Sequence, residues 1–512
     1  MKYLWLSLNK GQKVAFISVI IITLSFKLYK INMPILEGVF PRQVASAEIA
    51  KNIYLDGEWL RPKIDALPGP RLLLAEFPLY HGLVAMVNKV IGFPLEIAGR
   101  MVTVISFVLT GLIMFILANR YVGTEVALAS LFFYGTSPLG IIYGKAFQVD
   151  MFMVLISVAS IYLWDLWLDK KEAKYFIFAI IFIGITPLNK FTGLSILLPI
   201  LFLSYEKFGN RFLYKPSVIS MLFASILPLI LWINYIYSLK SQMTPISAHG
   251  LDAGIWIQLN PFFSYSYYKQ LYEMVVGVVL TPIGFCLAII GVAVRLNNRK
   301  DLFWHVWLLS TLSQFVLLNT KFAVHWFLLS LPVFSVFMGK GLVLLINNIP
   351  KSKTYIFNRS SMVFGFLFYL AIVIGYSNSA YKIPEGVKNI VEIGNAVKSI
   401  SNENDIIVTD YAGWKGAYFS GRLGYSMTYG KEKILRYLSR MKKYSNEPEM
   451  AMVKPDPVSL LEYFRKKGAK YFSCSKCFKP SFPREFYKYL VSNYNVVVEK
   501  KGIYKIFDLF AE

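Results

Sequence analysis

The chain has 512 residues, of which 56% are hydrophobic and only 16% are charged. Soluble domains carry about 25% charged residues, so this composition excludes a soluble globular protein and indicates a polytopic membrane protein. The net charge of +24 favours contact with anionic membrane lipids, and no basic run is interleaved with aromatic residues, so we expect no nucleic-acid partner.

The first apolar stretch runs from Val14 to Tyr29 behind a basic N-terminus. It lacks a small-residue cleavage site and is therefore predicted to be an uncleaved first span. A span needs about 17–25 apolar residues, or somewhat fewer inside a bundle, and the chain has about eleven such segments. They are predicted at 13–31, 99–118, 125–143, 149–168, 174–188, 191–205, 217–238, 274–294, 302–319, 323–346 and 360–378.

Lysine and arginine divide the connecting loops into two kinds. Every second loop is rich in them, and these loops lie around residues 120, 170–174, 207–215, 295–300 and 351–359. Cytoplasmic loops hold the excess of Lys and Arg, so the N-terminus is predicted to be cytoplasmic. The odd number of spans then predicts an exoplasmic C-terminus.

Two large pieces are expected on the exoplasmic side. The first is a loop at 32–98, and it belongs to a transmembrane domain that covers residues 1–378. An amphipathic stretch from Leu79 to Ile91 in this loop is predicted to lie in the membrane interface. The second piece, 379–512, is predicted to be a separate soluble domain.

The pattern of residues 379–512 alternates between helix and strand. Helices are predicted at 387–400, 457–468 and 483–494, strands at 405–410 and 469–473, and a terminal hairpin at 495–499 and 502–509. Such alternation indicates a small α/β domain. The fold class is thus a polytopic α-helical membrane protein with a C-terminal exoplasmic α/β domain.

Cys474 and Cys477 in this region have the spacing of a metal-ligand or redox pair. Without a second pair or nearby histidines the motif is weak evidence for zinc. A disulfide and two free thiols are the other interpretations, and the sequence leaves all three open.

Short motifs follow one another in a fixed order along the chain. They are Arg42-Gln43, Ala47-Glu48-Ile49-Ala50-Lys51-Asn52, Gly57-Glu58-Trp59-Leu60-Arg61-Pro62, Glu76-Phe77-Pro78-Leu79-Tyr80, Gly99-Arg100, Tyr143-Gly144-Lys145-Ala146-Phe147-Gln148-Val149-Asp150, Asn189-Lys190-Phe191-Thr192-Gly193 and His325-Trp326-Phe327. The series resembles the polyprenyl-phosphate-sugar glycosyltransferases of the GT-C superfamily. Within it, the protein O-mannosyltransferases and the lipid A aminoarabinose transferases are the most similar groups. The match to Glu76-Phe77-Pro78-Leu79-Tyr80 is the most specific part.

This resemblance implies an integral membrane glycosyltransferase of a bacterial or archaeal cell membrane. It would transfer a hexosyl or pentosyl group, with inversion, from a polyprenyl-phosphate donor to a lipid, glycan or protein acceptor on the exoplasmic face. No cofactor is expected. A divalent metal stays open, with His249 and Asp252 as the candidate ligands beside Glu76.

The chemistry of such a transfer selects two kinds of candidate residue. A carboxylate must take the proton of the acceptor hydroxyl, and the candidates on the expected side of the membrane are Glu37, Glu48, Glu76 and Asp150. Cations must offset the charge that develops on the lipid phosphate. The candidates are Arg42, Arg61, Arg71, Lys190 and His325.

The resemblance does not assign the general base. Relatives carry an acidic residue near the start of the first loop, where this chain has Arg42-Gln43 and Ala45. A non-catalytic homologue is therefore one alternative. A transporter or lipid flippase is another, and it would need ionisable residues at mid-span depth.

Several candidates also have a purely structural interpretation. Asp150 begins a predicted span, where it can cap the helix. Glu48 and Lys51, three residues apart, can form a surface ion pair. Lys190 can extend its ammonium group toward the interface without binding anything.

The predicted topology is tested by labelling Ser401→Cys in intact cells. If residues 379–512 are exoplasmic, a thiol reagent that cannot cross membranes will label this variant before the cells are lysed. Labelling that requires lysis would reverse the orientation of the whole chain.

Overall fold

The computed structural model describes residues 2–38, 40–67, 71–74, 76–244, 247–248, 264–294, 300–317, 323–348, 355–411, 415–444 and 448–510. The chain divides into two compact units. Unit 1 contains Met1–Asn32, Ile97–Ile233 and Ile255–Lys382, and unit 2 contains Met33–Glu96, Asn234–Gly254 and Ile383–Glu512. The first loop thus groups with the C-terminal region, whereas the sequence analysis assigned it to the transmembrane domain.

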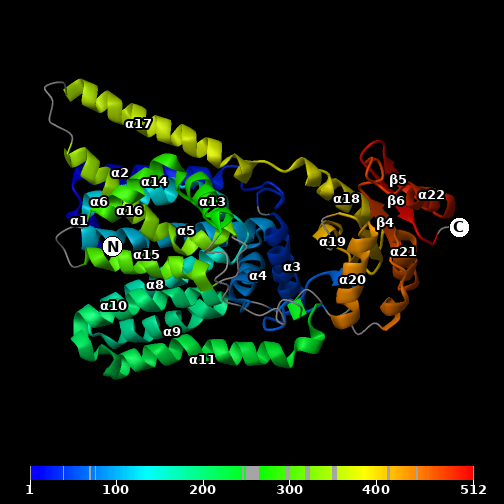
Figure 1. The fold of residues 1–512 in the computed structure, drawn as a ribbon, viewed down its shortest axis with the longest axis horizontal. Helices are drawn as coiled ribbons and strands as arrows, with labels where there is room; N and C mark the ends of the chain where they lie inside the picture. Colours follow the sequence, from blue (N-terminus) through cyan, green and yellow to red (C-terminus); the bar gives the residue numbers. More distant parts are fainter. Residues whose placement is uncertain are drawn as a thin grey trace. The chain divides into compact units, whose positions relative to one another are not determined.

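Unit 1 is a bundle of helices (Figure 1). Its longer helices are α2 (Lys10–Leu28), α5 (Leu95–Val122), α6 (Thr124–Thr136), α8 (Asp150–Lys170), α9 (Ala173–Asn189), α10 (Leu197–Phe208), α11 (Pro216–Ser238), α13 (Tyr265–Met274), α14 (Thr281–Ala293), α15 (Asp301–Leu317), α16 (Leu331–Asn348) and α17 (Tyr355–Tyr376). The shorter ones are α1 (Lys2–Ser7), α7 (Pro138–Tyr143), η1 (Phe191–Ile196), η2 (Gly209–Tyr214), η5 (Val275–Leu280), η6 (Val324–Leu329) and η7 (Asn378–Tyr381).

Seven helices in the described part of the chain are long and apolar enough to cross a membrane, or eight if a bent pair at Val363–Tyr376 and Asn378–Val387 is one span. They confirm the polytopic α-helical class. Three of the predicted spans correspond to helices that are shorter or broken. The span predicted at 125–143 breaks between α6 and α7 at Ser137, and α9 and α15 have 17 residues each. The count of eleven stays a prediction.

A buried ion pair joins α15 to α16. Lys340, in the middle of α16, donates to Asp301 Oδ2 at 2.6 Å, and the two side chains are 1% and 0% exposed. An isolated charge at such a depth is costly, whereas a paired one is tolerated. The pairing with Asp301 therefore allows Lys340 to lie inside a helix that is otherwise apolar enough to be a membrane span.

In unit 2, the first loop folds into α3 (Phe40–Asp56), the two-residue strand β1 (Ala66–Leu67) and α4 (Leu79–Ile91). The last of these coincides with the predicted amphipathic stretch. The sequence analysis did not predict β1, which pairs in parallel with β3 (Gly424–Ser426). The backbone N–H of Gly424 also donates to the carbonyl of Asp65 at 3.1 Å.

A six-stranded sheet organises the remainder of unit 2, with the strand order β1-β3-β2-β4-β6-β5. Parallel pairs join β1, β3, β2 (Ile406–Thr409) and β4 (Ala469–Cys474), and the terminal strands β5 (Asn495–Lys500) and β6 (Tyr504–Asp508) are antiparallel. These bounds confirm the predicted strands at 405–410 and 469–473 and the predicted hairpin.

Helices cover both faces of this sheet. On one face, Val408, Phe472 and Phe507 pack against α20 (Lys431–Tyr444), α21 (Pro457–Lys466) and α22 (Arg484–Asn493). On the other face, the preceding residue of each strand, Ile407, Tyr471 or Ile506, packs with α18 (Ile390–Ile400) and α19 (Lys415–Ser420). Successive side chains of a strand point to opposite faces, so strands that are apolar at consecutive positions require a layer on each side. Two short turns, η8 (Glu385–Val387) and η9 (Pro448–Met452), complete the unit.

Replacing Lys340 with Met should destabilise the bundle, because it leaves the Asp301 carboxylate buried without its ammonium partner. Such a change costs about 3–5 kcal/mol. Melting temperatures in detergent should show a large loss for Lys340→Met and a smaller one for the double variant Asp301→Asn/Lys340→Met, in which no charge is left. Equal losses in the two variants would contradict this account.

Candidate functional site

Asp150 and Lys190 form an ion pair at one end of the bundle of unit 1. Asp150 is the first residue of α8, where a negative charge is favoured by the helix dipole, and Lys190 directly follows α9. Lys190 Nζ lies 2.7 Å from Asp150 Oδ1, and the two side chains are 10% and 1% exposed. The structure therefore brings together one candidate acid and one candidate phosphate ligand. The ammonium group holds the carboxylate in position.

Lys27 is a buried cation that the sequence analysis treated only as an interruption of the first span. It lies in the last turn of α2 and is 0% exposed. Its ammonium donates to the carbonyl of Gly135 at 3.2 Å and lies 4.2 Å from the centre of the Phe107 ring. A carbonyl and an aromatic face satisfy a cation without neutralising it.

Lys145 and Arg100 are buried near the same end of α2. Lys145 donates to the carbonyl of Tyr29 at 3.4 Å and lies 4.1 Å from the ring centre of Tyr381, and it is near enough to Lys27 to repel it. Arg100 donates to the carbonyl of Ile31. The sequence analysis named both only as members of motifs. A lysine inside an apolar stretch was the signal that would have identified Lys27, because such residues are costly and usually functional.

A glycine makes room for these cations. A Cβ atom on Gly144 would lie 2.3 Å from the carbonyl oxygen of Gly140 and 2.7 Å from the Cε of Lys27. The motif Tyr143-Gly144-Lys145 thus needs a glycine so that the chain before α8 can approach the end of α2. This approach brings Lys145 next to Lys27.

His325 belongs to η6 and lies beside the same segment. Its ring centre is 6.3 Å from that of Tyr143, two residues before Lys145. In unit 1, Asp150 and Lys190 thus pair with each other, and His325 lies beside Tyr143 in the segment that leads to Asp150. Cations next to a carboxylate can bind an anionic group while the carboxylate accepts a proton.

The remaining candidates lie in unit 2. Arg42, near the start of α3, has its guanidinium Nη2 4.0 Å from Glu76 Oε1, and both side chains are about one-third exposed. Glu37 is buried, and its carbonyl accepts a hydrogen bond from the side chain of Gln43 at 3.1 Å. The basic residue of the first motif and the acid of the most specific motif therefore meet.

Arg71 contacts residues of the first loop, whereas Arg61 contacts a residue from a later loop of the chain. Arg71 donates to Asp65 Oδ1 at 2.6 Å, and Lys51 pairs with the other oxygen of the same carboxylate. Asp65 precedes β1, so this network holds the strand that enters the sheet. The exposed Arg61 donates to the side chain of Gln242. Arg71 thus has a structural partner, and Arg61 stays accessible to solvent.

Glu48 lies inside α3 and is 0% exposed, which excludes the surface ion pair with Lys51. Neither of its carboxylate oxygens has a hydrogen-bond partner of ordinary geometry, although the backbone of Asp65 lies close by. Burial raises the pKa of Glu48 well above its usual value, and the nearby Asp65 raises it further. Lys51 and Lys415 act in the opposite direction. A carboxyl group with a raised pKa is available to hold a proton near neutral pH.

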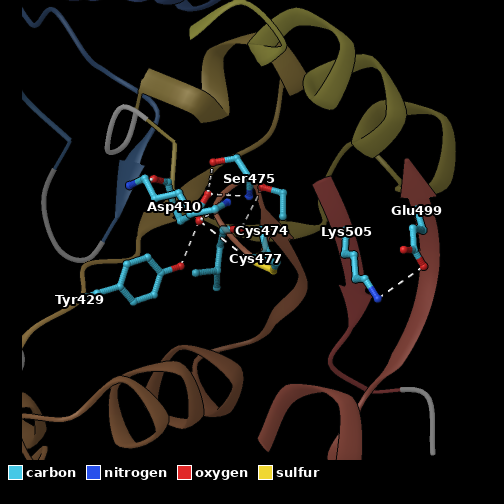
Figure 2. The surroundings of a disulfide bond; sticks show 10 residues. Asp410, Tyr429, Cys474, Ser475, Cys477, Glu499 and Lys505 are labelled. Carbon is cyan, nitrogen blue, oxygen red and sulfur yellow. Dashed lines mark hydrogen bonds and ion pairs between the residues drawn. A yellow bond between two sulfur atoms is a disulfide. The ribbon is translucent and has the colours of Figure 1, made fainter. Parts of the chain in front are cut away.

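Cys474 and Cys477 form a disulfide, so of the three interpretations of this motif the disulfide is the one that the structure confirms. In Figure 2 the disulfide lies beside Asp410 at the end of β2. Among the described residues, no group of three or more His, Cys, Asp and Glu side chains is arranged to hold a metal. His249 and Asp252 lie outside the described residues.

Residues 76–242 match the family of dolichyl-phosphate-mannose-protein mannosyltransferases. This segment contains Glu76, Asp150 and Lys190 and covers about one-third of the chain. A comparison with curated proteins returns no match.

Solved structures match nearly the whole chain. ArnT from Cupriavidus metallidurans in the apo state has a TM-score of 0.63 and 14% identity over 97% of this chain and 98% of ArnT, and its complex with undecaprenyl phosphate gives the same TM-score. The archaeal oligosaccharyltransferase AglB from Archaeoglobus fulgidus, in complex with an inhibitory peptide and a dolichol-phosphate, has a TM-score of 0.55 and 11% identity over 91% of this chain and 69% of AglB. The arabinofuranosyltransferase AftD from Mycobacteria has a TM-score of 0.58 and 12% identity over 99% of this chain and 40% of AftD. The expected GT-C resemblance is therefore confirmed for the fold.

The raised pKa of Glu48 predicts a dependence of stability on pH. A carboxyl group whose folded pKa exceeds its unfolded value stabilises the folded state at low pH, and this contribution is lost as the pH rises through the folded pKa. Glu48→Gln keeps the shape and cannot ionise. Its melting temperature should match that of the wild type near pH 4 and exceed it increasingly as the pH rises toward 8.

The matched control is Glu58→Gln, at a half-exposed position that pairs with Lys63 at 3.0 Å. It should not become progressively more stable than the wild type over this pH range. Parallel curves for Glu48→Gln and the wild type would show that Glu48 ionises normally in the folded protein.

Proposed function

We propose that this chain, which has the fold of the GT-C glycosyltransferases, transfers a sugar from a polyprenyl-phosphate carrier to an acceptor on the exoplasmic face of a cell membrane. The observation that carries the proposal is the ion pair of Asp150 and Lys190 at the end of a bundle that also buries Lys27 and Lys145. A lipid phosphate requires cations at this depth, and an acceptor hydroxyl requires a base beside them.

Asp150 is our candidate for the general base. Its carboxylate would take the proton from the acceptor hydroxyl while the oxygen of that hydroxyl forms a bond to the anomeric carbon of the sugar. The bond from this carbon to the phosphate oxygen breaks, and the lipid phosphate leaves with its electron pair. One hydrogen of the Lys190 ammonium points to Asp150, so two others are available for the phosphate.

Three further cations are candidates for the same phosphate. Lys27 contacts the carbonyl of Gly135 and the ring of Phe107, and Lys145 contacts the carbonyl of Tyr29 and the ring of Tyr381. His325 beside Tyr143 is the third. The similarity to ArnT supports this assignment, because one of its structures is bound to undecaprenyl phosphate.

The first loop offers a second set of candidates. Glu76 and Arg42 form an exposed pair, and we propose that they contact donor or acceptor. Glu37 and Glu48 are buried, which makes them weaker candidates for direct contact with a substrate. Arg61 is accessible for phosphate contact, whereas Arg71 is engaged with Asp65. The class of sugar, hexosyl or pentosyl, and of acceptor, lipid, glycan or protein, stays open within the proposal.

Asp150→Asn keeps the shape of the side chain and removes the base. Transfer from a polyprenyl-phosphate sugar should fall about 100-fold or more, the usual scale of a lost acid–base residue. Glu76→Gln should reduce transfer as well if its carboxylate orients Arg42. The measurement is transfer of a radiolabelled sugar by purified protein, and nucleotide sugars should not serve as donors.

Asp169→Asn is the matched control, because Asp169 lies at the opposite end of the same helix α8 and is half-exposed. It should keep near-wild-type transfer, and all three variants should melt near the wild-type temperature. Full activity in both Asp150→Asn and Glu76→Gln would remove these two residues from the catalytic site, whereas absence of transfer by the wild-type protein would favour the non-catalytic homologue. Transfer from a nucleotide sugar without lipid would contradict the proposed polyprenyl-phosphate donor.

A further inference from the structure

A pocket lies in unit 2, at the carboxyl ends of two central strands of the sheet. Its walls include Tyr411, which follows β2, and the disulfide loop Ser475–Lys479, which follows β4. Asn389, before α18, and Gly502, in the turn between β5 and β6, complete it. The cavity measures about 170 Å³. This volume is below that of pockets for drug-sized ligands, about 300–1,000 Å³, and suits one ring-sized group.

The topology of the sheet explains why a hollow forms there. After β2 the chain passes through α19 to β3 on one side, whereas after β4 it passes through the disulfide loop and α22 toward β5 and β6 on the other side. The connections from two adjacent parallel strands therefore leave in opposite directions. Ligands of open α/β sheets bind in the crevice that such a divergence creates.

The disulfide loop is held firmly at this position. Asp410 is buried at the end of β2, and its carboxylate accepts hydrogen bonds from the backbone N–H of Ser475 at 2.9 Å and of Lys476 at 3.1 Å. It also accepts bonds from the hydroxyl of Ser475 at 2.6 Å and of Tyr429 at 3.1 Å (Figure 2). The disulfide closes the same loop. The pocket wall is thus set in place before any ligand arrives, which lowers the entropic cost of binding.

The side chains of the pocket combine aromatic, cationic, amide and acidic groups. Tyr411 and Phe478 line it with aromatic rings, and Asn389 adds an amide. The acidic member, Glu385, is exposed and pairs with Lys388 outside the pocket at 3.4 Å. Lys476 donates to the carbonyl of Asp410 at 2.8 Å, and two further hydrogens of its ammonium stay available. In the part of the chain that the structure describes, no acidic side chain forms an ion pair with the exposed Lys479.

We propose that this pocket binds a sugar residue that carries a carboxylate or a phosphate. A sugar ring presents C–H groups that pack on aromatic side chains and hydroxyls that need amide and backbone partners, and the ammonium groups of the two lysines can bind an anionic substituent. Under the proposed function, the anionic sugar would belong to an acceptor glycan. That assignment rests on the proposed function, whereas the binding of an anionic sugar to this pocket does not.

The test is binding of four probes to the full-length protein in detergent, measured by saturation-transfer NMR and calorimetry. Glucuronic acid and glucose 6-phosphate represent the two anionic forms, and glucose and inorganic phosphate represent the sugar and the anion alone. We expect at least one anionic sugar to bind about tenfold or more tightly than both glucose and inorganic phosphate. The proposal would be overturned if glucose bound as tightly as the anionic sugars, or if inorganic phosphate bound as tightly as they do.

Two variants assign the binding to this pocket. Lys479→Ala and Phe478→Ala alter exposed side chains and should each weaken binding of the anionic sugar about tenfold. Lys488→Ala, on the exposed face of α22 outside the pocket, is the matched control and should leave the affinity unchanged. Unchanged affinity in Lys479→Ala would exclude this pocket as the site.

The binding measurement contains no lipid donor, so it is separate from the transfer assay. Sugar binding that persists in a protein without transfer activity would support the pocket and count against the glycosyltransferase. Transfer activity without binding of any anionic sugar would overturn the pocket alone.

Discussion

Buried charge is the constraint on which the membrane part of this protein depends. A charged side chain inside a helix bundle is tolerated only where another group compensates it. Lys340 is compensated by Asp301, and Lys190 by Asp150. Lys27 instead has a carbonyl and an aromatic ring. The pair of Lys340 and Asp301 is fully buried and structural, whereas the cations at the end of the bundle are our candidates for binding an anion.

The second constraint is the sheet of unit 2. Strand β1 contributes only two residues, yet it ties the first loop to strands that follow it by more than 350 positions. The carboxylate of Asp65 anchors this strand through Arg71 and Lys51. As a result, the loop that contains Arg42, Glu48 and Glu76 is part of the same compact unit as the C-terminal domain. The same sheet creates the pocket at the ends of β2 and β4.

The two proposed sites use different chemistry for the same kind of ligand group. In the bundle, a phosphate would meet cations that are fully buried, where electrostatic interactions are strong because water is excluded. In the sheet domain, an anionic sugar would meet the half-buried Lys476 and the exposed Lys479 beside aromatic rings, where charge contributes less and shape contributes more.

The sequence by itself determined the features that depend on local pattern. Apolar length indicated the spans, and alternation of helix and strand predicted β2, β4, the terminal hairpin, α18, α21 and α22 near their observed bounds. The order of the motifs also made Asp150, Lys190 and His325 candidates, and in the structure the first two pair with each other while His325 lies beside Tyr143. Only the tertiary structure decided that β1 joins the sheet and that Arg71 pairs with Asp65. It also decided that Glu48 is buried and that Lys27 and Lys145 lie near each other. Each of these features depends on backbone segments that are distant in the sequence coming close together, as Gly144 permits. The periodicity of a short stretch of sequence contains no information about such an approach.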